Sequence, residues 1–240
     1  EGRLELNNIC FRYTPDMPYV LDGLDLRIEP GEYIGIVGSS GCGKSTLMRI
    51  LLGFEVPERG SVYYDERELG QLDLPSLRRR IGVVLQDGKL FAGDIFSNIT
   101  ICAPWLTMEG AWEAAERAGL AEDIRQMPMG MFTMISEDGG GISGGQRQRL
   151  LIARALASDP GVLLFDEATS ALDNETQGRV VDTLKQMKCT RLVIAHRLST
   201  IRDCDRILYL EQGRIAEQGT YEKLLHCNGR FAQMAKRQLL

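Results

Sequence analysis

Apolar residues gather in short, almost continuous runs that are separated by helix-prone segments. Four such runs have the composition of strands buried on both faces, and they span residues 33–37, 81–85, 162–165 and 191–195. Buried strands that alternate with helices are typical of a parallel sheet. The pattern therefore predicts an α/β fold with a mostly parallel sheet.

The two ends of the chain follow another pattern. Residues 3–28 hold two segments of alternating apolar positions around a Thr-Pro-Asp turn, which favours an N-terminal antiparallel β subdomain. Residues 206–216 predict a hairpin through Glu-Gln-Gly. The last segment, 220–240, predicts two helices, which begin at the capping residues Thr220 and Asn228.

Strand patterns disappear in the middle of the chain. Residues 94–130 are dominated by helix-prone sequence, most clearly at 108–118. We therefore expect a single domain over residues 1–240, with an α/β core formed by 1–93 and 131–240. The segment 94–130 is predicted to be an inserted helical lobe, which extends towards 142–146.

A glycine-rich loop, Gly-Ser-Ser-Gly-Cys-Gly-Lys-Ser-Thr, follows the first buried run and precedes a helix-prone segment. Strand, glycine loop and helix form the context of a phosphate-binding P-loop. Glycines allow backbone N–H groups to turn towards an anion, Lys44 adds a full charge, and Ser45 offers a hydroxyl to Mg²⁺. A chance Gly-Lys-Ser turn would not match every fixed position. The predicted nucleotide-binding residues here are Gly38, Ser39, Ser40, Gly41, Cys42, Gly43, Lys44, Ser45 and Thr46.

Composition narrows the class of protein. The chain is 44% hydrophobic and 25% charged, as is usual for a globular protein, and its net charge of −5 provides no general basic field. Nucleic acid is therefore not expected as a partner. The six cysteines include no C-x-x-C pair, which favours reduced thiols over a disulfide framework. Because Cys42 lies in the glycine loop, an alkylating reagent is expected to inhibit nucleotide binding.

No apolar run reaches the roughly 18 residues that a membrane-spanning helix needs. Glu1 is not a natural initiator. We therefore expect the chain to be a fragment of a longer protein, in which a membrane portion could lie outside the sequence given.

A second glycine run, at residues 139–145, precedes a predicted helix from 147 to 157. Ser143 and Gln146 have the S-x-x-Q spacing of a capping box, so Ser143 is the predicted N-cap. One interpretation is an ordinary hinge before a helix. The other, favoured by the glycines and the capping serine, is a second helix N-terminus able to bind an anion.

Polar residues follow the other buried runs at the edge where α/β proteins bind ligands. Asp166 and Glu167 end one strand, and in a P-loop protein such a pair is suited to Mg²⁺ and to the attacking water. Gln86 and His196 end two others. A lone His is usually structural, although its place at a strand end favours a role in the site. Tyr13 either stacks on a base or covers a sheet edge.

Together these residues closely resemble the nucleotide-binding domain of ATP-binding cassette (ABC) transporters over essentially the full chain. The signature sequence is far more specific than the P-loop, which kinases and GTPases share. The matching motifs are Tyr13 (A-loop), Gly38 to Thr46 (Walker A), Gln86 (Q-loop), Ile142 to Gln146 (LSGGQ signature, with Ile for Leu), Val162 to Asp166 (Walker B) followed by Glu167, Ser170 to Asp173 (D-loop) and His196 (switch histidine).

The resemblance implies ATP and Mg²⁺ as ligands and a second copy of the domain as partner. Two domains would pack head-to-tail, so that the signature of each closes over the nucleotide on the P-loop of the other. The implied catalytic residues are Glu167, His196, Lys44 and Gln86; those implied to hold the metal are Ser45, Gln86 and Asp166; those implied to contact nucleotide besides the P-loop are Tyr13, Gln86, Asp166, Asp173 and, in trans, Ser143, Gly144, Gly145 and Gln146.

Several segments resemble the exporter branch of the family, among them 195–201 and 217–220. This implies an ATPase that powers export of a substrate, with a peptide or bacteriocin as candidate cargo. It also implies a transmembrane domain in the same polypeptide and a place at the cytoplasmic face of the membrane. Glu137 matches the branch, whereas Asp138 stands where a basic residue is usual.

Two other functions are compatible with a P-loop fold. A soluble ABC ATPase of DNA repair or translation usually carries long coiled-coil insertions or a second cassette, and neither occurs in this sequence. A regulatory module that binds nucleotide without hydrolysing it would not need Glu167 and His196.

Overall fold

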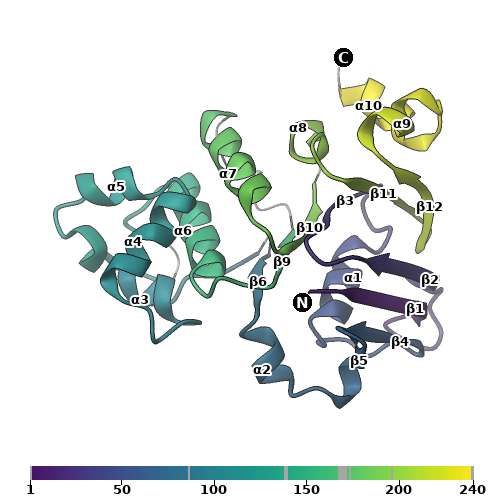
Figure 1. Ribbon diagram of the computed structural model, residues 1–240, viewed down its shortest axis with the longest axis horizontal. Coiled ribbons are helices and arrows are strands. Elements are labelled where there is room, and N and C mark those ends of the chain that lie inside the picture. The colour runs from purple at the N-terminus through teal and green to yellow at the C-terminus, as the bar shows by residue number, and fades with distance from the viewer. Residues whose placement is uncertain are drawn as a thin grey trace. The chain divides into compact units, whose positions relative to one another are not determined.

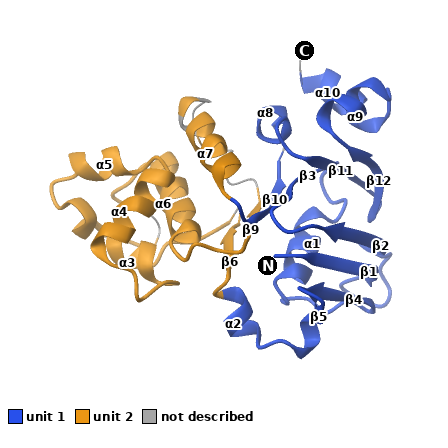
Figure 2. Ribbon diagram, viewed as in Figure 1, with its two compact units in different colours: residues 1–78, 188–240 blue, residues 79–187 orange. Residues whose placement is uncertain are grey.

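The structure is a computed structural model that describes residues 2–85, 87–137, 140–166, 172, 174–195 and 197–238. The chain forms two compact units (Figure 2). Unit 1 comprises residues 1–78 and 188–240, and unit 2 comprises residues 79–187.

Unit 1 contains the N-terminal antiparallel sheet that the alternating pattern predicts. Its strand order is β2-β1-β4-β5, and the bounds are β1 Leu4–Phe11, β2 Leu21–Ile28, β4 Arg59–Tyr64 and β5 Arg67–Glu68. Leu4 pairs with Ile28, and both side chains are fully buried. One face of this sheet is therefore part of the core of unit 1, as alternation requires.

Unit 1 also contains the strand that leads into the glycine loop. This strand, β3 (Tyr33–Val37), lies between two parallel neighbours, β10 (Thr190–Ile194) and β11 (Arg206–Glu211). Every residue of β3 is buried, as its continuous apolar sequence predicts. The predicted hairpin is confirmed, because β11 turns back into β12 (Arg214–Gly219) through Gln212 and Gly213, whose φ values of 48° and 73° fit a type I′ turn.

The helical segments of unit 1 are short. They are α1 Lys44–Leu51, η1 Leu69–Gln71, α2 Leu74–Arg78, α8 Leu198–Ile201, α9 Tyr221–His226 and α10 Arg230–Gln238. The prediction of a cap at Thr220 is confirmed, because its side chain accepts a hydrogen bond from the Lys223 N–H at 3.3 Å.

The cap predicted at Asn228 is wrong. Helix α10 begins at Arg230, and Glu217 of β12 accepts the N–H groups of Arg230 and Phe231 at 2.5 and 3.2 Å. Gly229 makes this possible, since a Cβ there would lie 2.4 Å from the Glu217 carboxylate. Asn228 instead takes a left-handed φ of 51° in the turn between α9 and α10.

Unit 2 combines two parallel strands with a group of helices (Figure 1). Strands β6 and β9 pair in parallel, and the short strands β7 and β8 pair antiparallel. The bounds are β6 Ile81–Val84, β7 Gly93–Asp94, α3 Ile95–Thr100, α4 Met108–Arg117, α5 Ala121–Gln126, η2 Gly130–Phe132, β8 Met134–Ile135, α6 Gly144–Leu156, β9 Val162–Asp166 and α7 Asn174–Gln186.

Helices dominate residues 95–126, where the inserted lobe is predicted. Helix α6 packs against both α3 and α4. The exact limits of the lobe, 94 and 130, stay a prediction, as does the assignment of all 240 residues to one domain. Among the described residues, none of the helices has the length and apolarity needed to cross a bilayer.

Candidate functional site

The glycine loop connects the C-terminal end of β3 to the N-terminus of α1, as predicted. Gly38, Gly41 and Gly43 have φ values of 151°, 77° and 106°, which residues other than glycine rarely adopt. Gly43 is the N-cap of α1 and provides no side-chain hydrogen bond to it. The N-terminal end of this helix, with its positive dipole, therefore borders the loop without a capping side chain.

Lys44 lies over the same loop. Its ammonium donates hydrogen bonds to the carbonyl oxygens of Gly38 and Ser39, both at 2.9 Å, and only 7% of the residue is exposed. Ser45 is exposed at the first turn of α1. The loop thus brings together a cation, a helix N-terminus and an accessible hydroxyl, which is the donor set that suits a nucleotide phosphate with its Mg²⁺.

Tyr13 contacts the end of the same loop in unit 1. Its hydroxyl lies 3.0 Å from the Thr46 Oγ1, and its ring meets Phe11 edge-on with centroids 5.0 Å apart. The residue is nevertheless 54% exposed. Of the two uses left open by the sequence, stacking on a base fits an exposed ring that is anchored beside the phosphate loop.

The strand behind the loop is closely packed against the segment that follows β10. A Cβ at Gly35 would lie 2.8 Å from Ile201 Cγ2 and 3.2 Å from the Cys204 sulfur, so α8 packs tightly on β3. Burial raises the pKa of the Cys204 thiol to about 12 and also raises the pKa of the Tyr33 phenol. Both groups therefore stay neutral at physiological pH.

Asp166 ends β9 in unit 2. The residue is 5% exposed, and the preceding Phe165 pairs with Val84 at the end of β6. The predicted site residues Gln86, Glu167, Asp173 and His196 lie outside the described residues, as do Ser170 and Ala171 of the D-loop.

The signature segment has the predicted capping box. The Ser143 Oγ accepts the Gln146 N–H at 3.2 Å, and the Gln146 Oε1 accepts the Ser143 N–H at 2.9 Å. Gly144 and Gly145 form the first turn of α6. Ser143 is exposed, so its hydroxyl and the N-terminal end of this helix are accessible.

Sequence reasoning missed Asp123. This residue of α5 accepts hydrogen bonds from the side chains of Gln146 and Arg149 at 2.8 and 2.9 Å. Nothing in the sequence around position 123 indicates this contact, because 23 residues separate Asp123 from Gln146.

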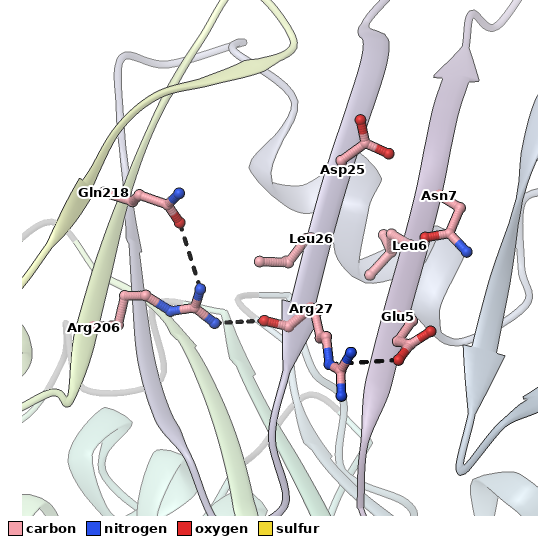
Figure 3. Close-up of a pocket in the computed structure, with 8 residues that line it drawn as sticks. All are labelled: Glu5, Leu6, Asn7, Asp25, Leu26, Arg27, Arg206 and Gln218. Atoms are coloured by element: carbon pink, nitrogen blue, oxygen red, sulfur yellow. Dashed lines mark hydrogen bonds and ion pairs between the residues drawn. The ribbon is translucent and has the colours of Figure 1, made fainter.

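A pocket of about 310 Å³ lies elsewhere in unit 1, between the antiparallel sheet and the β11–β12 hairpin (Figure 3). Arg206 bonds to Gln218 at 3.4 Å and to the Arg27 carbonyl at 2.5 Å, while Arg27 lies 3.6 Å from Glu5. Both arginines of the pocket thus have polar partners within its lining, and no predicted site residue lines the pocket. The full lining is Glu5, Leu6, Asn7, Asp25, Leu26, Arg27, Arg206 and Gln218.

Comparison with known proteins indicates the same family as the sequence motifs. A family model described as ABC transporter matches residues 21–170. The leukotoxin translocation ATP-binding protein LktB of Mannheimia glucosida is 45% identical over 243 residues, which cover all of this chain and 34% of that protein. The alpha-hemolysin translocation ATP-binding protein HlyB of Escherichia coli is 46% identical over 227 residues, which cover 93% of this chain and 32% of HlyB.

The fold is also similar to that of a solved structure. A bacterial Atm1-family ABC exporter with ATP bound matches the whole chain with a TM-score of 0.96 and 39% sequence identity, over 42% of the exporter chain. This confirms the predicted fold class. The chain spans about a third of the length of the curated relatives it matches. It belongs to the ABC transporter family.

Proposed function

We propose that this chain hydrolyses ATP in alternation between a closed dimer and an open state, and so powers export across a membrane. The observation that carries the proposal is the pair of helix N-termini, at α1 and α6, each preceded by a glycine-rich segment. One nucleotide needs only one phosphate loop. The exposed second N-terminus has a use when it faces the nucleotide of a partner domain.

Binding is assigned to the residues around the loop in unit 1. Tyr13 stacks on adenine, while Lys44 and the loop N–H groups hold the β- and γ-phosphates. Lys44 must exchange its bonds to Gly38 and Ser39 for phosphate oxygens. These carbonyls keep the ammonium within the loop beforehand, which lowers the cost of ordering it on binding.

Mg²⁺ fits the oxygen donors of Ser45, Gln86 and Asp166, because it prefers hydroxyl, amide and carboxylate ligands together with water. When bound, it neutralises charge on the β- and γ-phosphates. Glu167 follows Asp166 directly and is the proposed base or water-positioning residue. His196 follows the buried Ala195 and is assigned to the γ-phosphate.

The proposed partner is a second copy of the domain or a closely related one. In the closed state Ser143, Gly144, Gly145 and Gln146 would face the partner's nucleotide, with Asp173 at the interface. Closure on ATP and opening after hydrolysis would then drive a transmembrane domain, which we place in the same polypeptide, with this chain at the cytoplasmic face. The names of LktB and HlyB refer to toxin translocation, and a polypeptide is the cargo class we propose.

The test combines two variants with a titration of protein concentration. Wild-type ATPase activity should rise faster than linearly with protein concentration, because each site needs two chains. Glu167→Gln should keep ATP binding, lose turnover and accumulate dimer in ATP. Lys44→Ala should weaken ATP binding instead.

Opposite results point to specific errors. Normal turnover in Glu167→Gln would refute its role, and unchanged ATP affinity in Lys44→Ala would refute the loop assignment. ATP binding without hydrolysis in the wild type would favour a regulatory module. ATPase activity that rises strictly linearly with protein concentration would refute the composite site, in which the phosphate loop of one chain and the signature of its partner enclose one nucleotide.

A further inference from the structure

Asp123 uses both of its carboxylate oxygens on the first two turns of the signature helix. Oδ1 accepts the Gln146 Nε2 at 2.8 Å, and Oδ2 accepts the Arg149 guanidinium at 2.9 Å. The Asp123 side chain is 28% exposed and that of Arg149 only 10%. The ion pair is thus partly shielded from water. Charge-assisted hydrogen bonds are stronger in such a shielded environment than in water.

Gln146 links Asp123 to the signature serine, Ser143, through the two ends of its side-chain amide. While its Nε2 is held by Asp123, its Oε1 accepts the Ser143 N–H at 2.9 Å. The Ser143 Oγ in turn accepts the Gln146 N–H at 3.2 Å. A continuous series of hydrogen bonds therefore connects α5 to the N-cap of α6.

The carboxylate also selects one orientation of the Gln146 amide. Asp123 can only accept hydrogen bonds when ionised, so it requires the Nε2 of Gln146 on its side. The oxygen must then face Ser143, as the capping box requires. A flipped amide would set an oxygen against Asp123 and a donor against the Ser143 N–H, and would lose both bonds.

We propose that Asp123 is a positioning residue for the signature: it fixes Gln146 so that Ser143 is presented to the partner's nucleotide. This inference rests on the proposed composite site. It assigns Gln146 a role within its own chain, as the connection between Asp123 and Ser143. It also predicts that the phosphate loop of the same chain does not depend on Asp123.

The test reverses the direction of the hydrogen bond between positions 123 and 146. Asp123→Asn can offer its single acceptor oxygen to only one of the two donors, and Gln146→Glu sets one carboxylate against another. Each single variant should raise the protein concentration for half-maximal ATPase activity about tenfold, as expected for losing one bond to a charged group. In the double variant the introduced amide donates to the introduced carboxylate, whose other oxygen still accepts the Ser143 N–H. The protein concentration for half-maximal activity of the double variant should return to within about threefold of the wild-type value.

A matched control is Glu122→Ala, which removes an equal charge from the same helix. Among the described residues, Glu122 contacts its neighbours on α5, Arg125 at 3.6 Å and Gln126 at 3.5 Å, so this variant should behave as the wild type. Monomer affinity for a fluorescent ADP analogue, measured at low protein concentration, should stay unchanged in every variant. A purely structural loss would instead lower thermal stability and ADP affinity without rescue.

Three results would overturn the inference: a wild-type concentration dependence in Asp123→Asn, a double variant no better than the single ones, or an equal defect in Glu122→Ala. A wild type without concentration-dependent activity would refute the proposed function itself, and the inference with it.

Discussion

Gly38 and Gly41 allow two physical demands on the phosphate loop to be separated. Both have backbone angles that disfavour other residues, with φ values of 151° and 77°. A Cβ at Gly38 would lie 2.2 Å from the Leu210 carbonyl oxygen and 2.8 Å from the Cys42 sulfur, whereas a Cβ at Gly41 would have no atom within 4 Å. Gly38→Ala therefore meets both strain and a clash, and Gly41→Ala meets strain alone.

The magnitudes follow from these contacts. Placing a side chain in an unfavourable backbone region costs about 1–2 kcal/mol. Overpacking adds about 1–3 kcal/mol. At Gly38 this second cost applies in full, because Leu210 belongs to β11, whose backbone is fixed by pairing with β3 and β12. We expect Gly38→Ala to lose about 2–5 kcal/mol of unfolding free energy and Gly41→Ala about 1–2 kcal/mol.

Urea unfolding without nucleotide, followed by circular dichroism, measures both losses. Cys42 provides a local readout, because it is 6% exposed beside Gly38 and should react with a thiol reagent faster in Gly38→Ala than in Gly41→Ala. The reasoning would be refuted by equal losses of stability in the two variants, or by a larger loss in Gly41→Ala. Cys102 and Cys227, both exposed, and the partly exposed Cys189 should be replaced beforehand so that the buried thiols alone report.

Three further predictions concern stability. Ser143→Ala should cost about 1 kcal/mol by removing the N-cap of α6, measured by urea unfolding. Arg154→Leu should cost about 1.5–3 kcal/mol, because the guanidinium donates to the Asn98 carbonyl at 2.9 Å and to the Asn98 Oδ1 at 2.6 Å; a loss below about 0.5 kcal/mol, as for an exposed ion pair, would contradict this. The raised pKa of Cys204 stabilises the fold fully below its unfolded value of 9.0, and this contribution is lost as pH rises towards about 12. Thermal unfolding between pH 8 and 11 should show that loss, and Cys204→Ala should flatten it above pH 9.

The chemistry of the loop was predictable because its determinants are local in sequence. A strand is buried on both faces when its residues are continuously apolar, as in β3, and three glycines with positive φ and a lysine follow within seven positions. The capping box at Ser143 is predictable for the same reason, since its two partners are three residues apart. Neighbouring residues impose these geometries whatever the rest of the chain does.

Contacts between distant segments could not be predicted in this way. The sequence indicates an N-cap at Asn228, yet Glu217 of β12 takes that role because the hairpin brings its carboxylate to the start of α10. The contact between Tyr13 and Thr46 joins residues 33 positions apart. In each case the fold of the backbone brings a polar group to its partner. The pattern of residues along the sequence does not indicate how those distant segments come together.

Motif residues are recognisable because ligand geometry or a local backbone geometry dictates their spacing, while Asp123 has to satisfy only donors that α6 presents to it. Any helix that places a carboxylate at that point would serve equally well. Residues that set the orientation of a motif are therefore expected outside the motif, on packed neighbouring elements, and the polar contacts of each motif side chain are the place to find them.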